Sequence, residues 1–464
     1  MRRLRTRRAK QGPFFSLLLG ILLWAVPGHA QAPAVQRELS LDEVIDLALA
    51  KNAGLRAAER EVEAALKGHE AARGRLWPFA DVFGDWQYSG PNEENKTRLL
   101  ANIGRMPKLG PTLADNQPIG GVGRREFDHN LYALGLRVTY PLYVGGRIVA
   151  EIEANRLVTL LTRERLAQTA DELIFNLSST FYNLLRLREN VGATEANVRA
   201  LEEARKNIGS LVEVGRAPRV DLFKVNTRLA AVRQELTRAR NEVELAHAVL
   251  KTLMGLDVTE PLTVKGTLGT EAIPLDLGQD LRESERRRPE LQARRRTVEV
   301  REQQVRIARG ARLPSVSVRT QYLGGAGESE FGQPVGDFVV GVNVSVPLFT
   351  GGELTARIAQ EEAKLARARE ALEKARLDIQ LDVQAAHLQT TEARERIATA
   401  QAALEEAREA LRIEQLKMEV GKGIVEDLLD AQAAELQAET NHTRALADYN
   451  TALVARKKAI GRIR

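Results

Sequence analysis

The sequence predicts a mainly α-helical protein with a small β part, built from two structural repeats that each hold a strand hairpin and a hairpin of long helices. One short motif occurs twice, as YPLYVGGR over residues 140–147 and as VPLFTGGE over residues 346–353. A run of alternating apolar and polar residues precedes each copy, and a long helical pattern without proline follows it. Each copy therefore marks the point where a strand gives way to a helix.

The repeated motif contains the residues that such a junction needs. Pro141 and Pro347 are expected to end their strands, because proline has no N–H to donate to a β-ladder. The glycine pairs follow at once, as Gly145 and Gly146 in the first copy and as Gly351 and Gly352 in the second. Glycine allows the backbone to turn sharply into the helix.

The duplication extends well beyond the motif, as expected of an internal repeat. Adding 206 to a residue number carries the first motif onto the second and Val214 onto Val420. Upstream, a shift of 236 carries Leu55 onto Leu291. The difference of about thirty residues predicts an insertion within 90–130, which is rich in glycine, proline and asparagine. The predicted units are residues 31–270 and 271–464.

Residues 1–30 are predicted to be a secretory signal peptide. A basic stretch is followed by the apolar segment 14–26 and by small residues at 28–30 that suit a cleavage site. The alternative, a retained membrane anchor, is disfavoured because the apolar segment is too short to span a bilayer as a helix. Residues 1–30 hold six basic residues and no acidic residue, so they account for the net charge of +6 of the whole chain. The charge of the remaining chain therefore gives no support for nucleic-acid binding. The chain has no cysteine, which excludes disulfides and an N-terminal lipid anchor.

Four alternating runs predict strands at about residues 79–89, 131–142, 314–323 and 337–347. Each is about ten residues long, the length that a tilted strand needs to cross a bilayer. A soluble sandwich would also alternate, but it would not explain why only four strands accompany several hundred helical residues. Four strands cannot close a barrel, and open sheet edges do not occur in lipid. Lipid-facing strands would therefore require a dimer, trimer or tetramer.

The rest of the chain is predicted to form long helices. Two segments of 68 residues contain no proline, and each would be about 100 Å long. In the second, apolar residues recur every seven positions from Ile358 to Ala386 and again from Ile397 to Met418, as in packed helical bundles. The predicted helices are residues 39–49, 52–76, 147–214, 221–254, 289–312, 353–420 and 427–460.

These motifs, in this order and given twice behind a signal peptide, resemble the TolC-like outer-membrane efflux protein family (outer membrane factors). The resemblance covers about Leu39 to Gly461. It implies a homotrimer in which three chains give twelve strands to one β-barrel in the outer membrane, above an α-helical barrel in the periplasm. It also implies outer-membrane lipid, a periplasmic adaptor (membrane fusion) protein and an inner-membrane transporter as partners. The implied function is a passive exit duct for a tripartite efflux pump or a type I secretion system.

The turns of the two helical hairpins carry the candidate functional residues. The resemblance places adaptor docking at these tips, which are Val214, Gly215, Arg216, Val420, Gly421 and Lys422. Asp427 and Asp430 match the family's ring of constricting aspartates, and Asp221 is the counterpart of Asp427 in the first repeat. Carboxylates gathered from several copies would raise some of their own pKa values and favour cations. The alternative for Asp221 and Asp427 is helix capping, whereas Asp430 lies one turn further into its helix.

One departure from the family concerns the closed tip. Some members latch it with an arginine and a tyrosine, and the matching positions here are Gly423 and Met418. Closure is therefore expected to use other contacts, such as Arg216 or Arg219.

The remaining signals give no enzyme, metal or cofactor site. The six histidines show no ligand spacing and are expected on the surface, as are the arginine runs 286–288 and 294–296. No nucleophile elbow or dinucleotide fingerprint is present. A soluble periplasmic coiled-coil adaptor or scaffold is the alternative function, and it would lack outward apolar strand faces. The sequence does not encode whether the cargo is a drug, a metal ion or a polypeptide.

Overall fold

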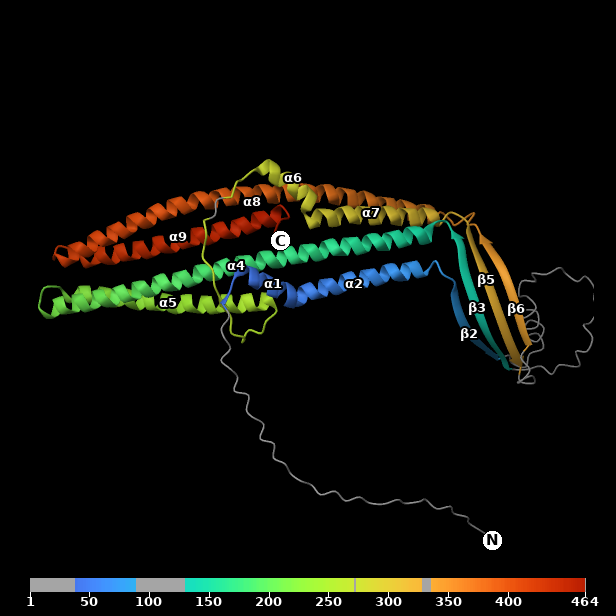
Figure 1. Cartoon of the computed structure of the whole chain (residues 1–464), viewed down its shortest axis with the longest axis horizontal. Helices are drawn as coiled ribbons and strands as arrows, with labels where there is room; N and C mark the ends of the chain where they lie inside the picture. The colour runs from blue at the N-terminus through green and yellow to red at the C-terminus, as the bar shows by residue number, and fades with distance from the viewer. Residues whose placement is uncertain (1–37, 89–129, 271–272, 328–334, 464) are drawn as a thin grey trace, which may run out of the picture.

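The structure, a computed structural model, describes residues 38–88, 130–270, 273–327 and 335–463. The predicted signal peptide and residues 90–129 of the predicted insertion lie outside the described residues. The described chain is elongated, with long helices running side by side and a sheet at one end (Figure 1). None of its helices is long and apolar enough to span a bilayer.

Each repeat contains two shorter helices, a strand hairpin and a long helical hairpin. The first repeat consists of α1 (Leu41–Lys51), α2 (Ala53–Gly74), β2 (Phe79–Tyr88), β3 (Asn130–Val144), α4 (Arg147–Glu213) and α5 (Arg219–Met254). The second consists of α6 (Leu277–Arg287), α7 (Pro289–Gly310), β5 (Ser315–Gly327), β6 (Val335–Ser345), α8 (Glu353–Glu419) and α9 (Val425–Ala459). The two-residue strands β1 (Glu38–Leu39) and β4 (Thr263–Val264) pair in parallel.

The two sequence shifts reappear in the element bounds. A shift of 236 carries α1 onto α6 and α2 onto α7 at both ends, and a shift of 206 carries α4 onto α8 at both ends. The pairing within the sheet follows the same rule, because Phe79↔Thr139 becomes Ser315↔Ser345. The fold class predicted from the sequence, mainly helical with two repeats and a small sheet, is confirmed.

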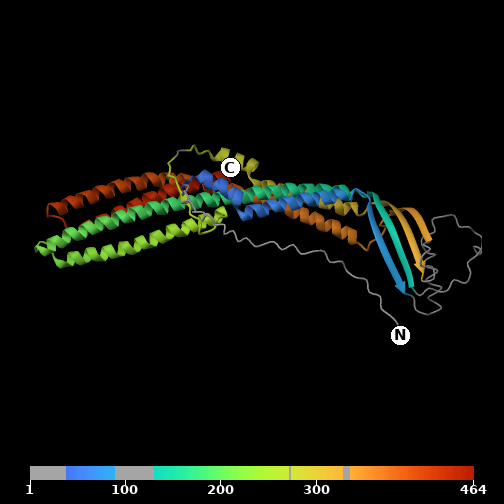
Figure 2. The ribbon, with the colours of Figure 1, turned by 60° about the horizontal axis from the view of Figure 1, so that its bottom comes forward.

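The helices pack in the order that the repeats impose. The long helices pair as α4 with α5 and as α8 with α9, and α7 lies between α4 and α8 (Figures 1 and 2). Near the middle of the molecule, α1, α4 and α5 share a core that includes Leu177, Leu184 and Leu250, all fully buried. Burying each such side chain contributes about 1.5–3 kcal/mol.

The predicted heptad pattern of α8 marks the side of the helix that packs. All nine apolar residues of the pattern between Ile358 and Met418 are buried or half-buried. By contrast, Leu377, Leu381 and Leu388 on the same helix are exposed. A single chain therefore leaves an apolar row of α8 open to solvent.

The four longer strands form one antiparallel sheet in the order β2-β3-β5-β6. Since side chains alternate between faces, the register places one apolar set on one side of the sheet. Its exposed members are Val82, Trp86, Tyr88, Leu134, Leu136, Tyr140, Tyr322, Phe338, Val340, Val342 and Val344. The opposite face carries Asp81, Arg137, Arg319 and Asn343.

The prediction that Pro141 ends its strand is wrong, because β3 continues to Val144. Pairing with β2 stops at Thr139, so Pro141 lies where one side of β3 has no partner strand in the described part of the chain. The ladder to β5 shifts register between Pro141 and Tyr143. Proline is tolerated at such edges and bulges because no ladder hydrogen bond is lost.

Other predicted bounds shift by a few residues for local reasons. Strand β5 runs past 323 because Gly324 and Gly325 still pair with β3. Strand β6 stops at Ser345, ahead of Pro347, because its partner β5 begins there. The return helix α5 begins directly after Pro218, a residue whose fixed φ suits a helix start. The remaining offsets are differences of one or two residues at helix and strand ends. The short helix α6 was not predicted from the sequence.

Candidate functional site

The two hairpins turn in the same way at the end of the molecule farthest from the sheet (Figure 1). Gly215 and Gly421 both have left-handed backbone conformations, with φ of 73° and 74°. The N–H of Arg216 donates to the carbonyl oxygen of Leu211 at 2.8 Å, and Lys422 makes the corresponding bond in the second hairpin. Glycine is required here because other residues rarely adopt a positive φ at a helix end.

The tips are held together by an apolar core that joins both hairpins. Val425 and Leu429 of α9 pack with Val225 and Leu229 of α5 and with Ile208 of α4. This core aligns the first turns of the two return helices. The side chains that face away from it are therefore presented at the tip in a fixed pattern.

An exposed ion pair links the hairpins across this core. The Nζ of Lys224 lies 2.6 Å from Oε2 of Glu426. The hydrogen bond raises the pKa of Lys224 and lowers the pKa of Glu426, because each partner stabilises the charged form of the other. Sequence reasoning missed this contact because its partners lie 202 residues apart.

The predicted aspartates lie on the outer side of the tip core. Asp427 and Asp430 are both exposed, whereas Leu428 and Leu429 between them are buried. Residues three apart lie on one side of a helix, so the two carboxylates face the same way. Asp221 is half-buried in the first turn of α5, and within the described chain no hydrogen bond joins it to the α9 pair. Neither α5 nor α9 has a side-chain hydrogen bond from its N-cap residue.

Gly423 occupies a position that has no room for a larger residue. A Cβ atom added there would lie 2.6 Å from Sδ and 2.7 Å from the backbone nitrogen of Met418. Met418 is half-buried against the tip core. This position therefore has no room for an arginine side chain, and Arg216 and Arg219 are both exposed.

The tips also expose apolar side chains, some of which the sequence analysis did not identify. Val214 and Val420 were predicted as docking residues, and both are mostly exposed. Val220, Phe223 and Ile424 are exposed beside them. Apolar residues at the starts of the two return helices are the sequence signal that would have identified these three.

At the opposite end, the glycines of the repeated motif form the strand-to-helix junctions. Gly145, Gly146, Gly351 and Gly352 all have positive φ, between 60° and 87°. Each helix begins directly after its second glycine. The predicted backbone role of these glycines is therefore what the geometry requires.

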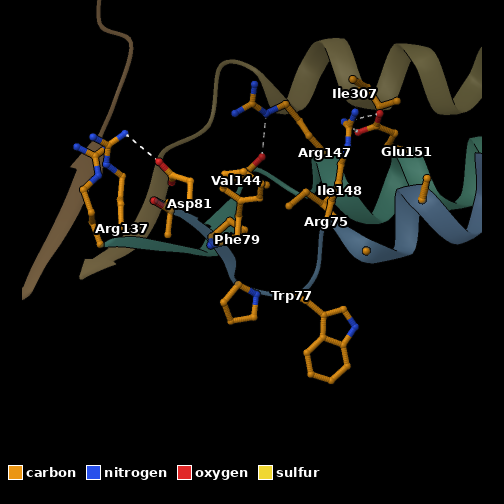
Figure 3. A pocket seen from close by; sticks show the side chains of 16 residues that line it. Arg75, Trp77, Phe79, Asp81, Arg137, Val144, Arg147, Ile148, Glu151 and Ile307 are labelled. Atoms are coloured by element: carbon orange, nitrogen blue, oxygen red, sulfur yellow. Dashed lines mark hydrogen bonds and ion pairs between the residues drawn. The ribbon is translucent and has the colours of Figure 1, made fainter. Parts of the chain in front are cut away.

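A cavity of about 850 Å³ lies between the polar side of the sheet and the helix ends (Figure 3). Arg137 lies 4.5 Å above the ring of Phe83 and 3.7 Å from Asp81. Arg75 pairs with Glu151 at 2.5 Å. These charged groups favour water on this side of the sheet, whereas the apolar side favours lipid.

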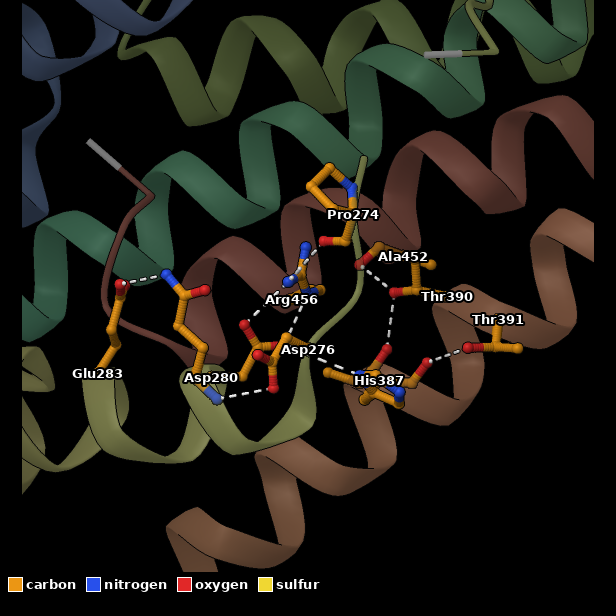
Figure 4. Close-up of polar contacts among 11 residues, drawn as sticks. Pro274, Asp276, Asp280, Glu283, His387, Thr390, Thr391, Ala452 and Arg456 are labelled. Atoms are coloured by element: carbon orange, nitrogen blue, oxygen red, sulfur yellow. Dashed lines mark hydrogen bonds and ion pairs between the residues drawn. The ribbon is translucent and has the colours of Figure 1, made fainter. Parts of the chain in front are cut away.

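A buried ion pair fixes the short helix α6 to the second hairpin (Figure 4). Arg456 donates two hydrogen bonds of 2.8 Å to the carboxylate of Asp280. The Nδ1 atom of His387 lies 3.8 Å from the same carboxylate. His387 and His247 are half-buried, and Arg288 is largely buried beside Asp382, so the predicted surface placement of these residues is wrong. Arg288 and His387 lie beside carboxylates that are distant in the sequence, on Asp382 and Asp280. No group of three or more acidic, His or Cys side chains in the described residues is arranged to hold a metal ion.

Long paired helices joined at one end to a sheet with an exposed apolar face are the architecture of an outer-membrane channel protein. Residues 44–256 and 281–462 match the outer membrane efflux protein family, and the chain belongs to this family.

Individual proteins similar to this chain are outer-membrane and secretion proteins. The chain is 23% identical to outer membrane protein TolC of Vibrio cholerae over 377 residues, covering 77% of this chain and 82% of TolC. It is 23% identical to the alkaline protease secretion protein AprF of Pseudomonas aeruginosa, covering 71% and 69%. Its fold matches the CmeC outer membrane channel of Campylobacter jejuni with a TM-score of 0.77 at 18% identity, covering 91% and 86%.

These comparisons confirm the predicted family, function class and location. The protein is an outer-membrane channel of the efflux and secretion class. Its family is one of channels rather than of enzymes.

Proposed function

We propose that three copies of this chain form a passive exit duct through the periplasm and outer membrane, serving a tripartite efflux pump or a type I secretion system. The main observation is the four-stranded sheet, whose exposed apolar face suits lipid. Among the described residues, its edge strands β2 and β6 lack partners on one side. Open edges are not stable in lipid, so neighbouring copies must complete the sheet. Geometry alone allows two, three or four copies, and the resemblance to TolC-like proteins selects three.

The assembly is tested by purifying the mature chain in detergent and measuring its mass by light scattering. A trimer that conducts ions in planar bilayers is expected. A protein that is monomeric and soluble without detergent would instead support the alternative, a periplasmic scaffold.

We also propose that Asp427 and Asp430 line the narrowest part of the duct at the tip. Their exposure, shared direction and position outside the tip core support this role. Carboxylates repeated around an axis attract cations and repel anions. Replacing both with alanine is expected to raise single-channel conductance and weaken cation preference, whereas Asp46→Ala on distant α1 should change neither. Unchanged conductance in the double variant would place the constriction elsewhere.

The hairpin tips are proposed to dock a periplasmic adaptor protein, which connects the duct to an inner-membrane transporter. The exposed apolar side chains Val214, Val420 and Phe223 support this, because buried apolar area contributes to most protein association. A photo-crosslinker at position 420 should capture a co-expressed adaptor, and one at position 46 should not. Cargo would then be chosen by the transporter rather than by this chain.

A further inference from the structure

We propose that the internal repeat gives the residue pairing between neighbouring copies, with Gly351 of one copy seated on Gly74 of the next and β6 paired with β2 in a defined register. The inference rests on the proposed assembly of several copies. The proposal specifies which residues of neighbouring copies are in contact. Its geometry is that of a contact already present within one chain.

The template is a contact between two glycines from different repeats. Gly145 at the β3–α4 junction and Gly310 at the end of α7 are both buried. A Cβ atom added to either glycine would overlap the carbonyl oxygen of the other. The two backbones therefore touch where the first repeat meets the second.

The same pair of glycines occurs once more in the chain, but without the contact. The shift of 206 carries Gly145 onto Gly351, and the shift of 236 carries Gly310 back onto Gly74. Both counterparts are exposed, and an added Cβ at either would have no atom within 4 Å. Each half of this second pair therefore needs a partner from another copy.

The strand pairings of the sheet give the register between copies independently of the glycine contact. Applying the two shifts to the β2–β3 pair Val82↔Leu136 gives Val318↔Val342, which is the pairing observed between β5 and β6. The shifts thus transfer register correctly within the chain. Strands β3 and β5 pair where the first repeat meets the second. Applying the same two shifts to this ladder therefore gives the pairing expected where one copy meets the next.

The transferred ladder pairs β6 of one copy with β2 of the next. Arg137↔Gln321 becomes Asn343↔Asp85, and Leu136↔Tyr322 becomes Val342↔Trp86. The second predicted pair joins residues of the apolar face, and the first joins residues of the polar face. Because a slip by one residue would exchange the faces, this agreement supports the register.

The long helices show the same missing neighbour. Helices α4 and α8 both have 67 residues, yet 22 are buried in α4 and only 8 in α8. Phe175 of α4 lies beneath the Nζ of Lys458 at 4.9 Å, whereas its counterpart Leu381 of α8 is exposed. A neighbouring first repeat placed by the same shifts would cover this row.

Disulfide trapping tests the register, because the chain has no cysteine of its own. Asp85→Cys with Asn343→Cys should give covalently linked copies on oxidation, seen on a non-reducing gel. The matched control, Asp85→Cys with Ser345→Cys, keeps the face but moves one cysteine by two residues. Directly opposed Cβ atoms lie about 4.5–5.5 Å apart and diagonal ones about 7–8 Å, beyond disulfide reach. The control should lose the linked species.

The glycine contact is tested by Gly74→Leu, with Gly192→Leu as control, since Gly192 is also an exposed helical glycine with open space around it. The first variant should keep its helical circular dichroism but lose the trimer, and the second should keep both. If the wild-type protein is a conducting trimer, two results would overturn the register: linked copies in the control cysteine pair, or no linked copies in the designed pair. Neither result would contradict the proposed function as a duct. A trimeric Gly74→Leu variant overturns the glycine contact. A wild-type monomer without conductance overturns both proposals.

Discussion

The short helix that begins each repeat packs on its own helical hairpin, but the two repeats use different chemistry there. In the first repeat the contact is apolar. Val44 of α1, Phe181 of α4 and Leu250 of α5 are buried in one hydrophobic cluster. Their side chains need no partner of particular charge, so the contact depends on shape and volume alone.

The equivalent positions of the second repeat are polar. The two shifts carry those three residues onto Asp280, His387 and Arg456, which form the buried ion-pair cluster. Two sets of side chains with opposite polarity thus occupy one backbone geometry. The difference shows that helix placement in this fold is set by the repeat as a whole, and that the chemistry at a contact can be exchanged if all its members change together.

The largest effect is expected when only one member of the polar cluster is removed. Asp280→Ala would leave the guanidinium of Arg456 buried without its carboxylate, which costs about 3–5 kcal/mol. The variant should unfold at lower temperature when followed by circular dichroism. Asp46→Ala, on the exposed side of α1, should not change the transition, and equal stability of both variants would mean that the pair is not buried in solution.

In the apolar cluster, the loss of unfolding free energy should come from the cavity that a substitution leaves and not from an unpaired charge. Leu250→Ala removes a fully buried side chain, and we expect a loss of about 2–5 kcal/mol. The loss should be independent of salt. Leu245→Ala on the exposed side of the same helix is the control, and it should leave denaturant unfolding nearly unchanged.

Transplanting the first repeat's chemistry into the second sharpens the comparison. The triple variant Asp280→Val, His387→Phe and Arg456→Leu replaces a buried ion pair with apolar residues known to fit the equivalent site. Such replacements are often neutral or stabilising by about 1–4 kcal/mol. Thermal unfolding of the triple variant should therefore recover what Asp280→Ala loses. A triple variant as unstable as the single one would show that the two sites differ in shape.

A smaller, pH-dependent effect is expected at His247 of α5, whose counterpart in α9 is the buried Leu453. Burial lowers the pKa of His247, so the folded state stays neutral where the unfolded state binds a proton. Its contribution to stability is present above the unfolded pKa of about 6.5 and falls as pH drops through it. His247→Leu should reduce the fall in the free energy of unfolding between about pH 7 and pH 5, because leucine does not titrate. An unchanged pH profile would contradict this.

The sequence predicted the architecture because the repeat is visible in residue types. Gly351 and Gly352 mark the start of α8 as clearly as Gly145 and Gly146 mark that of α4, and each pair must be glycine for backbone reasons. The tip aspartates were found through a motif of the family. Both are exposed, as the proposed pore role requires.

The contacts that sequence reasoning missed are long-range. Asp280 and Arg456 are 176 residues apart, and nothing in their local pattern indicates that both are buried. Pro141 was predicted to end its strand because the sequence alone does not show which strands pair beside it. Arginines such as Arg288 were placed in solvent for the same reason, although its side chain lies beside Asp382.

The bulge at Pro141 has a consequence for how deeply the molecule sits in the membrane. The register shift returns Tyr143 to the apolar side, beside Val316 and on the same side as Tyr140. Trp77, which is among the residues that line the cavity (Figure 3), and Phe349 are exposed at this same end of the sheet. Aromatic rings prefer the boundary between hydrocarbon and headgroups. They would form a collar that fixes the vertical position of the protein and resists its sliding toward either leaflet.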